Sequence, residues 1–389
     1  MQHLSQSPTD PGFVQNPYPF YARARAAGDL VLWEEYGLIC APTHAAVHAL
    51  LRDRRFGREC PPELAPDIPA PLAPFYALEA HSLLELEPPR HTRIRRLLTR
   101  AFTSARINAL APQIAALAHE LIDAFPTGSA FDLLPGFATP IPVRIICRLL
   151  GVPEEMAPQL LDWSHAMVAM YQARRTPEIE TAAARAAADF AGFMRGYVET
   201  RRRAPADDLI THLIAAEEAG DHLTPDELIA TCILLLNAGH EATVHSLANA
   251  VKTLLEHGKP PATPDAIEEA LRLDPPLHMF TRYAYGDVTV FGHRFRRGDK
   301  VGLLLASANR DPSHWPDPDR FDPARAAQTH HAFGGGLHFC IGAPLARLEL
   351  STALPILFDR LPGLALAAPP EYADSYHFHG LARLMLTPG

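Results

Sequence analysis

A glycine-rich segment carries one cysteine in a setting suited to metal chemistry. It runs Phe333-Gly-Gly-Gly-Leu-His-Phe-Cys340-Ile-Gly342 and leads directly into a helical pattern over residues 343–361. Consecutive glycines permit close backbone approaches that side chains forbid, so a large flat group could lie against this segment. The N–H groups at the start of the helix favour thiolate over thiol at Cys340. Such a thiolate, with no second ligand nearby, suits the axial position of a haem; the plainer interpretation is a glycine-rich turn with a buried cysteine.

A second group of candidate residues lies on a helix predicted within residues 88–102. Helical rotation places His91 and Arg95 on one apolar stripe. The stripe is completed by Ile94, Leu98 and Phe102. A histidine and an arginine on an apolar face need an anionic partner. That partner is either a bound acidic group or a carboxylate of the protein itself.

The longest helical pattern begins with the capping box Thr224-Pro-Asp-Glu227 and ends at Gly258, which suits a left-handed stop. About 33 residues at ~1.5 Å each give a helix of about 50 Å, long enough to cross a domain. Its middle, residues 237–243, reads Asn-Ala-Gly-His-Glu-Ala-Thr. Small residues beside polar ones either let another helix approach or mark a local widening of the helix.

Other elements must hold these helices in place. Residues 282–305 contain short β-branched runs separated by turn residues, which predicts a small antiparallel sheet. Residues 61–89 are rich in proline without periodicity, and a loop of that length is usually functional or mobile. A later helix carries Glu269 and Arg272, an i,i+3 pair.

Length and composition indicate one domain over residues 1–389, mainly helical and able to bury a large core. A net charge of −9 argues against nucleic acid as a partner. No apolar run is long enough to span a membrane, and the start has no leader-like pattern, so we expect a cytoplasmic protein. Four scattered cysteines, none in a C-x-x-C pair, are expected to be small buried side chains: Cys40, Cys60, Cys147 and Cys232.

The cysteine segment resembles the signature of the cytochrome P-450 family. The signature's Phe, Gly, His or Arg, Cys and Gly correspond to Phe333, Gly336, His338, Cys340 and Gly342. The resemblance covers nearly the whole chain and implies the family's triangular, mainly α-helical prism with a small β region and a long central helix over the haem. It implies a haem-thiolate monooxygenase that uses O2 to hydroxylate or epoxidise a small, largely apolar substrate. Cys340 would be the axial ligand of the iron in haem b (iron protoporphyrin IX).

The same resemblance assigns roles to other residues. Four of them match positions that meet the haem propionates, namely His91, Arg95, Arg282 and His338. Three more are expected beside the haem, namely Phe333, Ala238 and Gly239. Glu269 and Arg272 resemble the family's structural E-x-x-R element, whose third member here would be Arg320 or Arg325.

The central helix departs from the family's pattern at one position. Ala238, Gly239 and Glu241 match A-G-x-(D/E)-T, in which the acid and the alcohol help to deliver protons to bound dioxygen. Ala242 stands where most relatives have threonine, and Thr243 lies one residue later, about 100° around the helix. Three explanations stay open: local distortion brings Thr243 into place, ordered water or a substrate hydroxyl replaces the alcohol, or coupling is poor and peroxide leaks. We favour the second.

The resemblance also implies a ferredoxin-type electron donor with its reductase. Arg93, Arg96 and Arg100, opposite the apolar stripe, are either a solvated face or the docking surface for that donor. The substrate pocket is expected to be lined from five places by family position: residues 75–84, 163–175, 277–280 and 377–379, and the group Ala238, Gly239 and Ala242. The alternative functions are a peroxide-using haem-thiolate enzyme and a non-catalytic haem-binding sensor or carrier.

Overall fold

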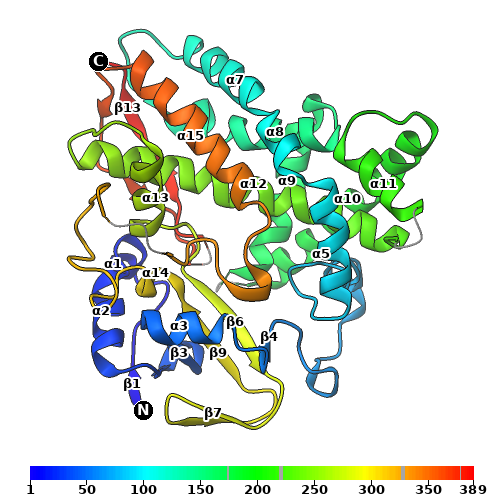
Figure 1. Cartoon of the computed structure of the whole chain (residues 1–389), viewed down its shortest axis with the longest axis vertical. Helices are drawn as coiled ribbons and strands as arrows, with labels where there is room; N and C mark the ends of the chain where they lie inside the picture. The colour runs from blue at the N-terminus through cyan, green and yellow to red at the C-terminus, as the bar shows by residue number, and fades with distance from the viewer. Residues whose placement is uncertain (173–174, 219–221, 326–328, 377) are drawn as a thin grey trace.

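The computed structural model describes residues 1–172, 175–218, 222–325, 329–376 and 378–389. Most of them are helical, and the helix α12 passes through the middle of the molecule (Figure 1). The helices are α1 (Pro11–Gln15), α2 (Tyr18–Ala27), α3 (His44–Leu50), α4 (Ala73–Glu79), α5 (Arg90–Ala101), α6 (Ser104–Asn108), α7 (Ala111–Asp123), α8 (Pro140–Leu150), α9 (Ala157–Val168), α10 (Pro177–Arg203), α11 (Leu209–Glu218), α12 (Pro225–Glu256), α13 (Pro264–Leu273), α14 (Leu305–Ala308) and α15 (Ala343–Arg360).

The central helix has the predicted ends. The Thr224 hydroxyl accepts from the Glu227 N–H and the Glu227 carboxylate accepts from the Thr224 N–H, which satisfies two N-terminal donors. At the other end Gly258 has a φ of +78°, so a residue without a side chain suits the stop. Between these ends α12 packs against α8, α9, α10, α13 and α15, and most of its side chains are buried. This helix is therefore the core of the helical body.

The β region is larger than the sequence predicts. Its main sheet has the strand order β1-β2-β3-β9-β6-β4. These strands are β1 (Gln2–Leu4), β2 (Val31–Trp33), β3 (Leu38–Ala41), β4 (Phe56–Gly57), β6 (Met279–Ala284) and β9 (Lys300–Leu304). The expected antiparallel pairing of β6 with β9 is present, but β3 pairs with β9 in parallel, as β1 does with β2. The sheet is thus mixed, because N-terminal strands that the sequence analysis missed complete it.

Smaller β units lie beside this sheet and near the C-terminus (Figure 1). They are the hairpin of β7 (Val288–Val290) and β8 (His293–Phe295), the pair of β11 (Glu371–Tyr372) and β12 (Leu381–Arg383), and the sheet of β10 (Ala365–Leu366), β13 (Met385–Thr387) and β5 (Phe131–Asp132).

The proline-rich stretch over residues 61–89 is more ordered than expected. Two short 3-10 turns, Pro62–Leu64 and Ala70–Leu72, are followed by α4, whose Phe75 and Leu78 are buried in the main core. The expectation of a long loop is wrong for this part, because alanine and leucine between the prolines are sufficient to form a helix once its apolar face is covered.

The Glu269 and Arg272 pair is a buried structural clamp. Arg272 makes two hydrogen bonds to Glu269, at 2.7 and 2.8 Å, and donates to the Asn309 carbonyl. The third member is Arg325, whose Nε lies 3.3 Å from Glu269 Oε1. Arg320 instead pairs at the surface with Asp322. The structure therefore decides between the two arginines that the sequence left open.

Candidate functional site

The cysteine segment forms a tight loop that leads into α15 and packs against the residue that follows α3. The Cys340 N–H donates to the Phe333 carbonyl at 3.0 Å, which closes the loop. Gly336 has a φ of +66°, and a Cβ there would lie 2.1 Å from the Leu51 carbonyl oxygen. The close approach that this glycine permits is thus to the protein's own backbone after α3, which holds the loop in one place.

The Cys340 sulfur lies at the N-terminus of α15 and keeps solvent-accessible surface. Burial among protein atoms raises the pKa of its thiol, while hydrogen bonds from the Gly342 and Ala343 N–H groups and the charges of Arg95 and Arg347 lower it. The N–H groups at the helix start thus favour the thiolate, as expected from the sequence, but burial outweighs them and the pKa stays raised. A cation bound to the sulfur would supply the missing stabilisation, and the backbone donors already suit a thiolate ligand.

A cluster of basic side chains lies next to this loop. His91 on α5 is fully buried, and neither of its ring nitrogens has a hydrogen-bond partner among the residues that the structure describes. Burial and the nearby His338 and Arg95 lower the pKa of His91 to about 4. Arg282 on β6 is also buried and donates to the Thr281 carbonyl; burial and the charge of Arg58 lower its pKa to about 10.

Only part of this cluster is satisfied by a carboxylate of the protein. His338 Nε2 lies 2.8 Å from Glu87 Oε1, and this contact holds the pKa of Glu87 below its usual value although burial opposes it. Arg95 donates to the Phe339 carbonyl. His91 is left with two buried polar nitrogens, which is costly unless a further group accepts or donates there. The cluster therefore fits a bound anionic group such as a propionate.

One face of α12, which carries residues expected beside the haem and the bound dioxygen, keeps accessible surface. Along this mostly buried helix, Ala238, Ala242 and His245 retain accessible surface and fall on one side at i, i+4 and i+7. Gly239 serves helix packing, since a Cβ there would meet Ile146 of α8 at 3.3 Å. The helix is α-helical throughout, so of the two alternatives for these small residues the structure supports the close approach of another helix and not a local widening.

Thr243 does not replace the alcohol that Ala242 lacks. Its side chain is buried, and its hydroxyl donates to the Gly239 carbonyl one turn earlier, at 3.2 Å. Because the backbone is undistorted, the first of the three explanations, a distortion that brings Thr243 into place, has no structural basis.

Glu241 is surrounded by histidines. Its carboxylate lies 3.1 Å from His165 Nε2, 3.6 Å from His240 Nε2 and 3.7 Å from His245 Nε2. Burial would raise the pKa of Glu241, but the adjacent imidazoles of His165 and His240 hold it well below its usual value. The side chain of His165 is 60% accessible, against 9% for Glu241. A buried carboxylate is therefore in contact with one imidazole that keeps accessible surface.

The sequence analysis missed these histidines as partners of Glu241. His240 and His245 stand one and four residues away on the same helix, so the i,i+4 spacing could have indicated them. His165 comes from α9, inside the expected pocket segment over residues 163–175, part of which lies outside the described residues. Nothing in the local sequence links it to α12.

Several expected pocket residues lie elsewhere. Trp163 packs on Phe190 of α10 with ring centroids 5.1 Å apart. His278 is fully buried against the Tyr21 hydroxyl, and His379 is buried beside Asp274. These side chains belong to the core because they have partners there, whereas Phe280 keeps accessible surface. His377 lies outside the described residues.

The three arginines opposite the apolar stripe of α5, namely Arg93, Arg96 and Arg100, have different surroundings. Arg93 forms an ion pair with Glu227 and donates to the His222 carbonyl, so it joins α5 to the start of α12. Arg96 and Arg100 are exposed. They line a hollow of about 400 Å³ together with Thr92, Arg95, Thr99 and Leu337. Leu337 belongs to the cysteine loop, so this hollow reaches the loop from outside.

Comparison with known proteins agrees with this arrangement. The family model described as Cytochrome P450 matches residues 71–260 and 258–361. The monooxygenase PikC of Streptomyces venezuelae is 37% identical over 92% of this chain and 87% of its own length. A vitamin D(3) 25-hydroxylase of Pseudonocardia autotrophica is 37% identical over 97% and 95%. The crystal structure of P450BioI in complex with an acyl carrier protein ligated to hexadec-9Z-enoic acid superposes with a TM-score of 0.91 and 32% identity, covering 97% and 99%.

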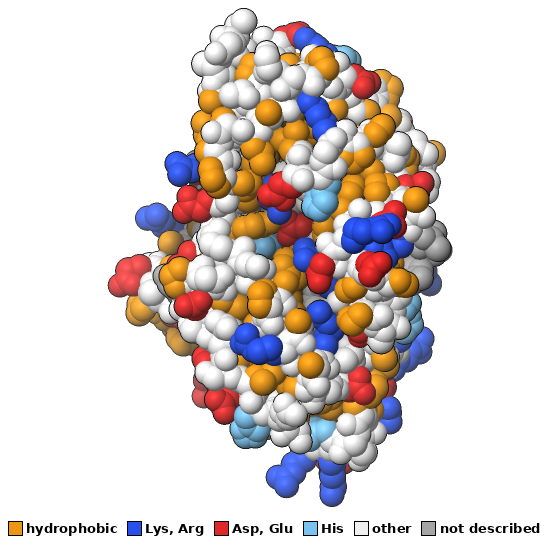
Figure 2. Space-filling model, turned by 90° about the vertical axis from the view of Figure 1, so that its left-hand side faces the viewer, with side chains coloured by type: hydrophobic (Ala, Val, Ile, Leu, Met, Phe, Trp, Pro, Cys, Tyr) orange, Lys and Arg blue, Asp and Glu red, His pale blue; other side chains and the backbone are white. Residues whose placement is uncertain are grey.

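Within the described part of the chain, no helix is both long enough and apolar enough to cross a membrane. On the face shown in Figure 2, acidic and basic side chains are interspersed.

Proposed function

The chain belongs to the cytochrome P450 family and is a haem-thiolate monooxygenase, and from this membership we propose that the thiolate of Cys340 would bind its haem iron. Three other cysteines, Cys40, Cys147 and Cys232, are buried thiols whose pKa burial raises to about 12. Cys340 differs because two backbone N–H groups and two arginines face its sulfur. When bound, the haem, which we take to be haem b, would supply the activation of dioxygen with electrons from a redox partner.

The observation that carries this proposal is the unsatisfied His91 beside the cysteine loop. We assign His91 and Arg282 to the haem propionates, with Arg95 and His338 next to them. His91 has two buried nitrogens without a partner in the described structure, and the buried Arg282 forms no ion pair with a carboxylate among the described residues. Anionic propionates would satisfy both groups. Phe333, Ala238 and Gly239 complete the proposed haem contacts on either side.

The proton route is proposed to run through Glu241 and His165. His165 is exposed at one end, and its contact with Glu241 raises the pKa of its imidazole. An imidazole that titrates near neutral pH can pass protons between water and a buried carboxylate. Since Ala242 has no hydroxyl and that of Thr243 is bonded to its own helix, ordered water or a hydroxyl of the substrate would complete the route.

The substrate is proposed to be small and largely apolar. On the accessible side of α12, Ala238 and Ala242 present methyl groups beside the one imidazole of His245, and Phe280 of the expected pocket segment also keeps accessible surface. Apolar lining with few polar groups binds such molecules by burying their surface. The names of the relatives describe their own substrates and do not identify this one.

The redox partner is proposed to be a ferredoxin-type protein that docks at the hollow beside α5. Arg95, Arg96 and Arg100 line it together with Leu337 of the cysteine loop. A basic surface steers an acidic partner, and this hollow gives access to the loop that carries the proposed ligand.

We also propose that the chain forms a single domain in the cytoplasm. All five cysteines are free thiols, which is typical of a reducing compartment.

Replacing the ligand tests the proposal directly. We expect Cys340→Ser to lose the absorption maximum that a thiolate-ligated haem shows after reduction and binding of carbon monoxide, together with substrate oxygenation. Cys60→Ser is the matched control, since Cys60 is a half-buried thiol away from α15 and should leave the spectrum unchanged. A thiolate-type spectrum in Cys340→Ser would refute the assignment.

A further inference from the structure

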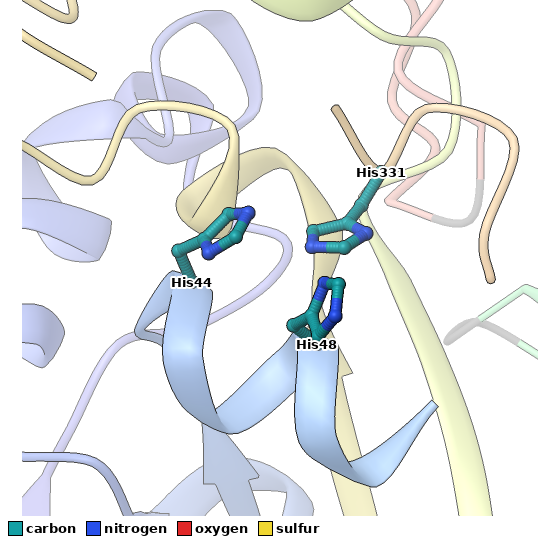
Figure 3. A group of neighbouring side chains, drawn as sticks. All are labelled: His44, His48 and His331. Carbon is teal, nitrogen blue, oxygen red and sulfur yellow. The ribbon is translucent and has the colours of Figure 1, made fainter. Parts of the chain in front are cut away.

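Three histidines from two distant parts of the chain meet behind the cysteine loop. His44 and His48 lie one turn apart on α3, and His331 points toward them from the segment that precedes the loop (Figure 3). One ring nitrogen from each of the three lies within 4.8 Å of the others. Two histidines at i and i+4 on one helix face, joined by a third, form a typical arrangement of imidazole ligands for a transition metal.

The nitrogens in this cluster have no protein partners among the described residues. The unpartnered atoms are His44 Nε2, His48 Nδ1 and both ring nitrogens of His331, and all of them are buried. His331 as a whole is fully buried. Buried polar atoms are rarely left unsatisfied, and each costs roughly 1–3 kcal/mol if nothing binds it. Four such atoms in one place indicate a ligand.

The surroundings hold the rings in position and supply no competing acid. The Thr329 backbone lies beside the His44 ring and raises the pKa of that imidazole, although burial lowers it more. The His331 N–H donates to the Asn309 side chain at 2.7 Å. His314 stacks on His44 with centroids 3.5 Å apart. The Asp311 carboxylate is engaged by the backbone N–H groups of His44 and Ser313.

The electrostatics keep the imidazoles neutral, as metal ligands must be. Burial and neighbouring histidines lower the pKa of His44 to about 4 and that of His331 to about 3, and burial and the charge of Arg52 lower the pKa of His48. Arg52 also faces His331, so the rings remain uncharged near neutral pH. Three neutral imidazoles prefer a borderline cation such as zinc to calcium or magnesium, which prefer oxygen.

We propose that His44, His48 and His331 bind one divalent transition-metal ion of the zinc type, with water completing the coordination. Zinc–nitrogen bonds of ~2.0–2.1 Å need the three nitrogens to face one ion, which a small ring rotation can achieve from nitrogens that lie within 4.8 Å of one another. The rotation this needs is available to His48, which is only half-buried. The ion has no part in the oxidation chemistry.

Such an ion would tie α3 to the segment that carries Cys340. The two already touch at one point, where Gly336 packs on the carbonyl of Leu51, the residue after α3. His331 is joined to the loop by the hydrogen bond from the Gly334 N–H to its carbonyl. A metal would add a second point of attachment. By mass action, an ion present at 100 times its Kd lowers the unfolding equilibrium constant about 100-fold.

The test is zinc binding by the haem-loaded protein after treatment with a chelator. We expect about one zinc per chain by elemental analysis, and displacement of a chromophoric zinc chelator in competition. His48→Gln should weaken the affinity about tenfold or more, with its carbon monoxide spectrum intact as proof of folding. Binding that is absent in the wild type, or equal in His48→Gln, would overturn the proposal.

Two further variants locate the ion. His119→Gln, on the exposed side of α7, removes a histidine remote from α3 and should bind zinc as the wild type does. His165→Gln alters the other partly exposed histidine cluster, that with His240 and Glu241. It should also keep the affinity, and a loss there instead would place the ion beside Glu241 and overturn the assignment to α3. Zinc should raise the Tm of the wild type and leave that of His48→Gln unchanged.

Discussion

The carboxylate of Glu241 on the central helix lies 3.1 Å from Nε2 of His165 on α9. The two side chains differ sharply in exposure, because Glu241 is almost fully buried and His165 opens to solvent. The pair therefore forms a short polar connection from an accessible imidazole to the helix on which the usual alcohol is replaced by Ala242. This connection offers a specific account of how protons could enter, and it can be tested one residue at a time.

We expect His165→Gln to lower product formation while leaving haem binding intact. Glutamine can still donate a hydrogen bond to Glu241 but cannot titrate near neutral pH. The product-forming kcat should fall about tenfold or more, with a larger share of NAD(P)H lost to peroxide. The measurement is product and peroxide formed per NAD(P)H consumed. His293→Gln, in the β7–β8 hairpin, is the control and should behave as the wild type. Unchanged coupling in His165→Gln would remove His165 from the route.

The same pair makes a prediction about stability and pH. The folded-state pKa of His165 is raised by Glu241, and that of Glu241 is lowered by its histidines. The His165 contribution is complete below the ordinary imidazole pKa of about 6.5 and is lost as the pH rises through the raised value. The Glu241 contribution is complete above the ordinary carboxyl pKa of about 4.3 and is lost on acidification. Urea unfolding should therefore show the largest difference between wild type and His165→Gln between about pH 4.3 and 6.5, and a smaller one at alkaline pH. A difference that grows with pH would contradict this.

Restoring the missing alcohol separates the remaining explanations for Ala242. If a substrate hydroxyl or ordered water completes the proton route, the added side chain of Ala242→Thr displaces it, and coupling should fall severalfold. Product per NAD(P)H is the quantity to measure. Thr243→Val is the control, because that hydroxyl serves only the Gly239 carbonyl and its loss should leave coupling near the wild-type value. A large rise in coupling with Ala242→Thr would show that the natural site is simply inefficient.

Local sequence signals predicted the ends of α12 well and the contacts between elements poorly. The capping box at Thr224 and the stop at Gly258 define α12 because both signals lie within a few residues of the helix end. Strand β3 is only four residues long and pairs with β9, far along the chain, so no local pattern reveals it.

In the candidate site, too, local features could be predicted from the sequence, whereas contacts between distant segments could not. The segment around Cys340 was recognisable because its glycines, histidine and cysteine stand together in the sequence. The partners of the candidate residues were not, since His165 reaches Glu241 from another helix and Arg93 turns to Glu227 rather than to solvent. The effect of burial on the Cys340 thiol also depends on packing, and no local signal at the helix start reports it.

Charge reversal at the hollow beside α5 tests the docking surface. The double variant Arg96→Glu, Arg100→Glu should slow reduction by an acidic ferredoxin about tenfold or more at low salt, and should weaken the salt dependence of that rate. Stopped-flow reduction at several salt concentrations measures both. The control is Arg294→Glu with Arg383→Glu, two highly exposed arginines on other elements that change the net charge equally. Equal slowing in the control would show a general charge effect instead of docking.

The last prediction concerns the clamp of Glu269 and Arg272. Arg325 lies with only 10% of its side chain accessible, contacts Glu269 and donates to the Arg320 and Asp317 carbonyls. Arg325→Ala leaves part of the Glu269 carboxylate and these carbonyls without donors, which should lower the free energy of unfolding by about 3 kcal/mol. Arg320→Ala, whose side chain is 66% accessible and within the described residues pairs with Asp322 alone, should change it by at most about 0.5 kcal/mol. Urea denaturation followed through the haem absorption compares the two, and an equal loss would mean that the clamp has no defined third member.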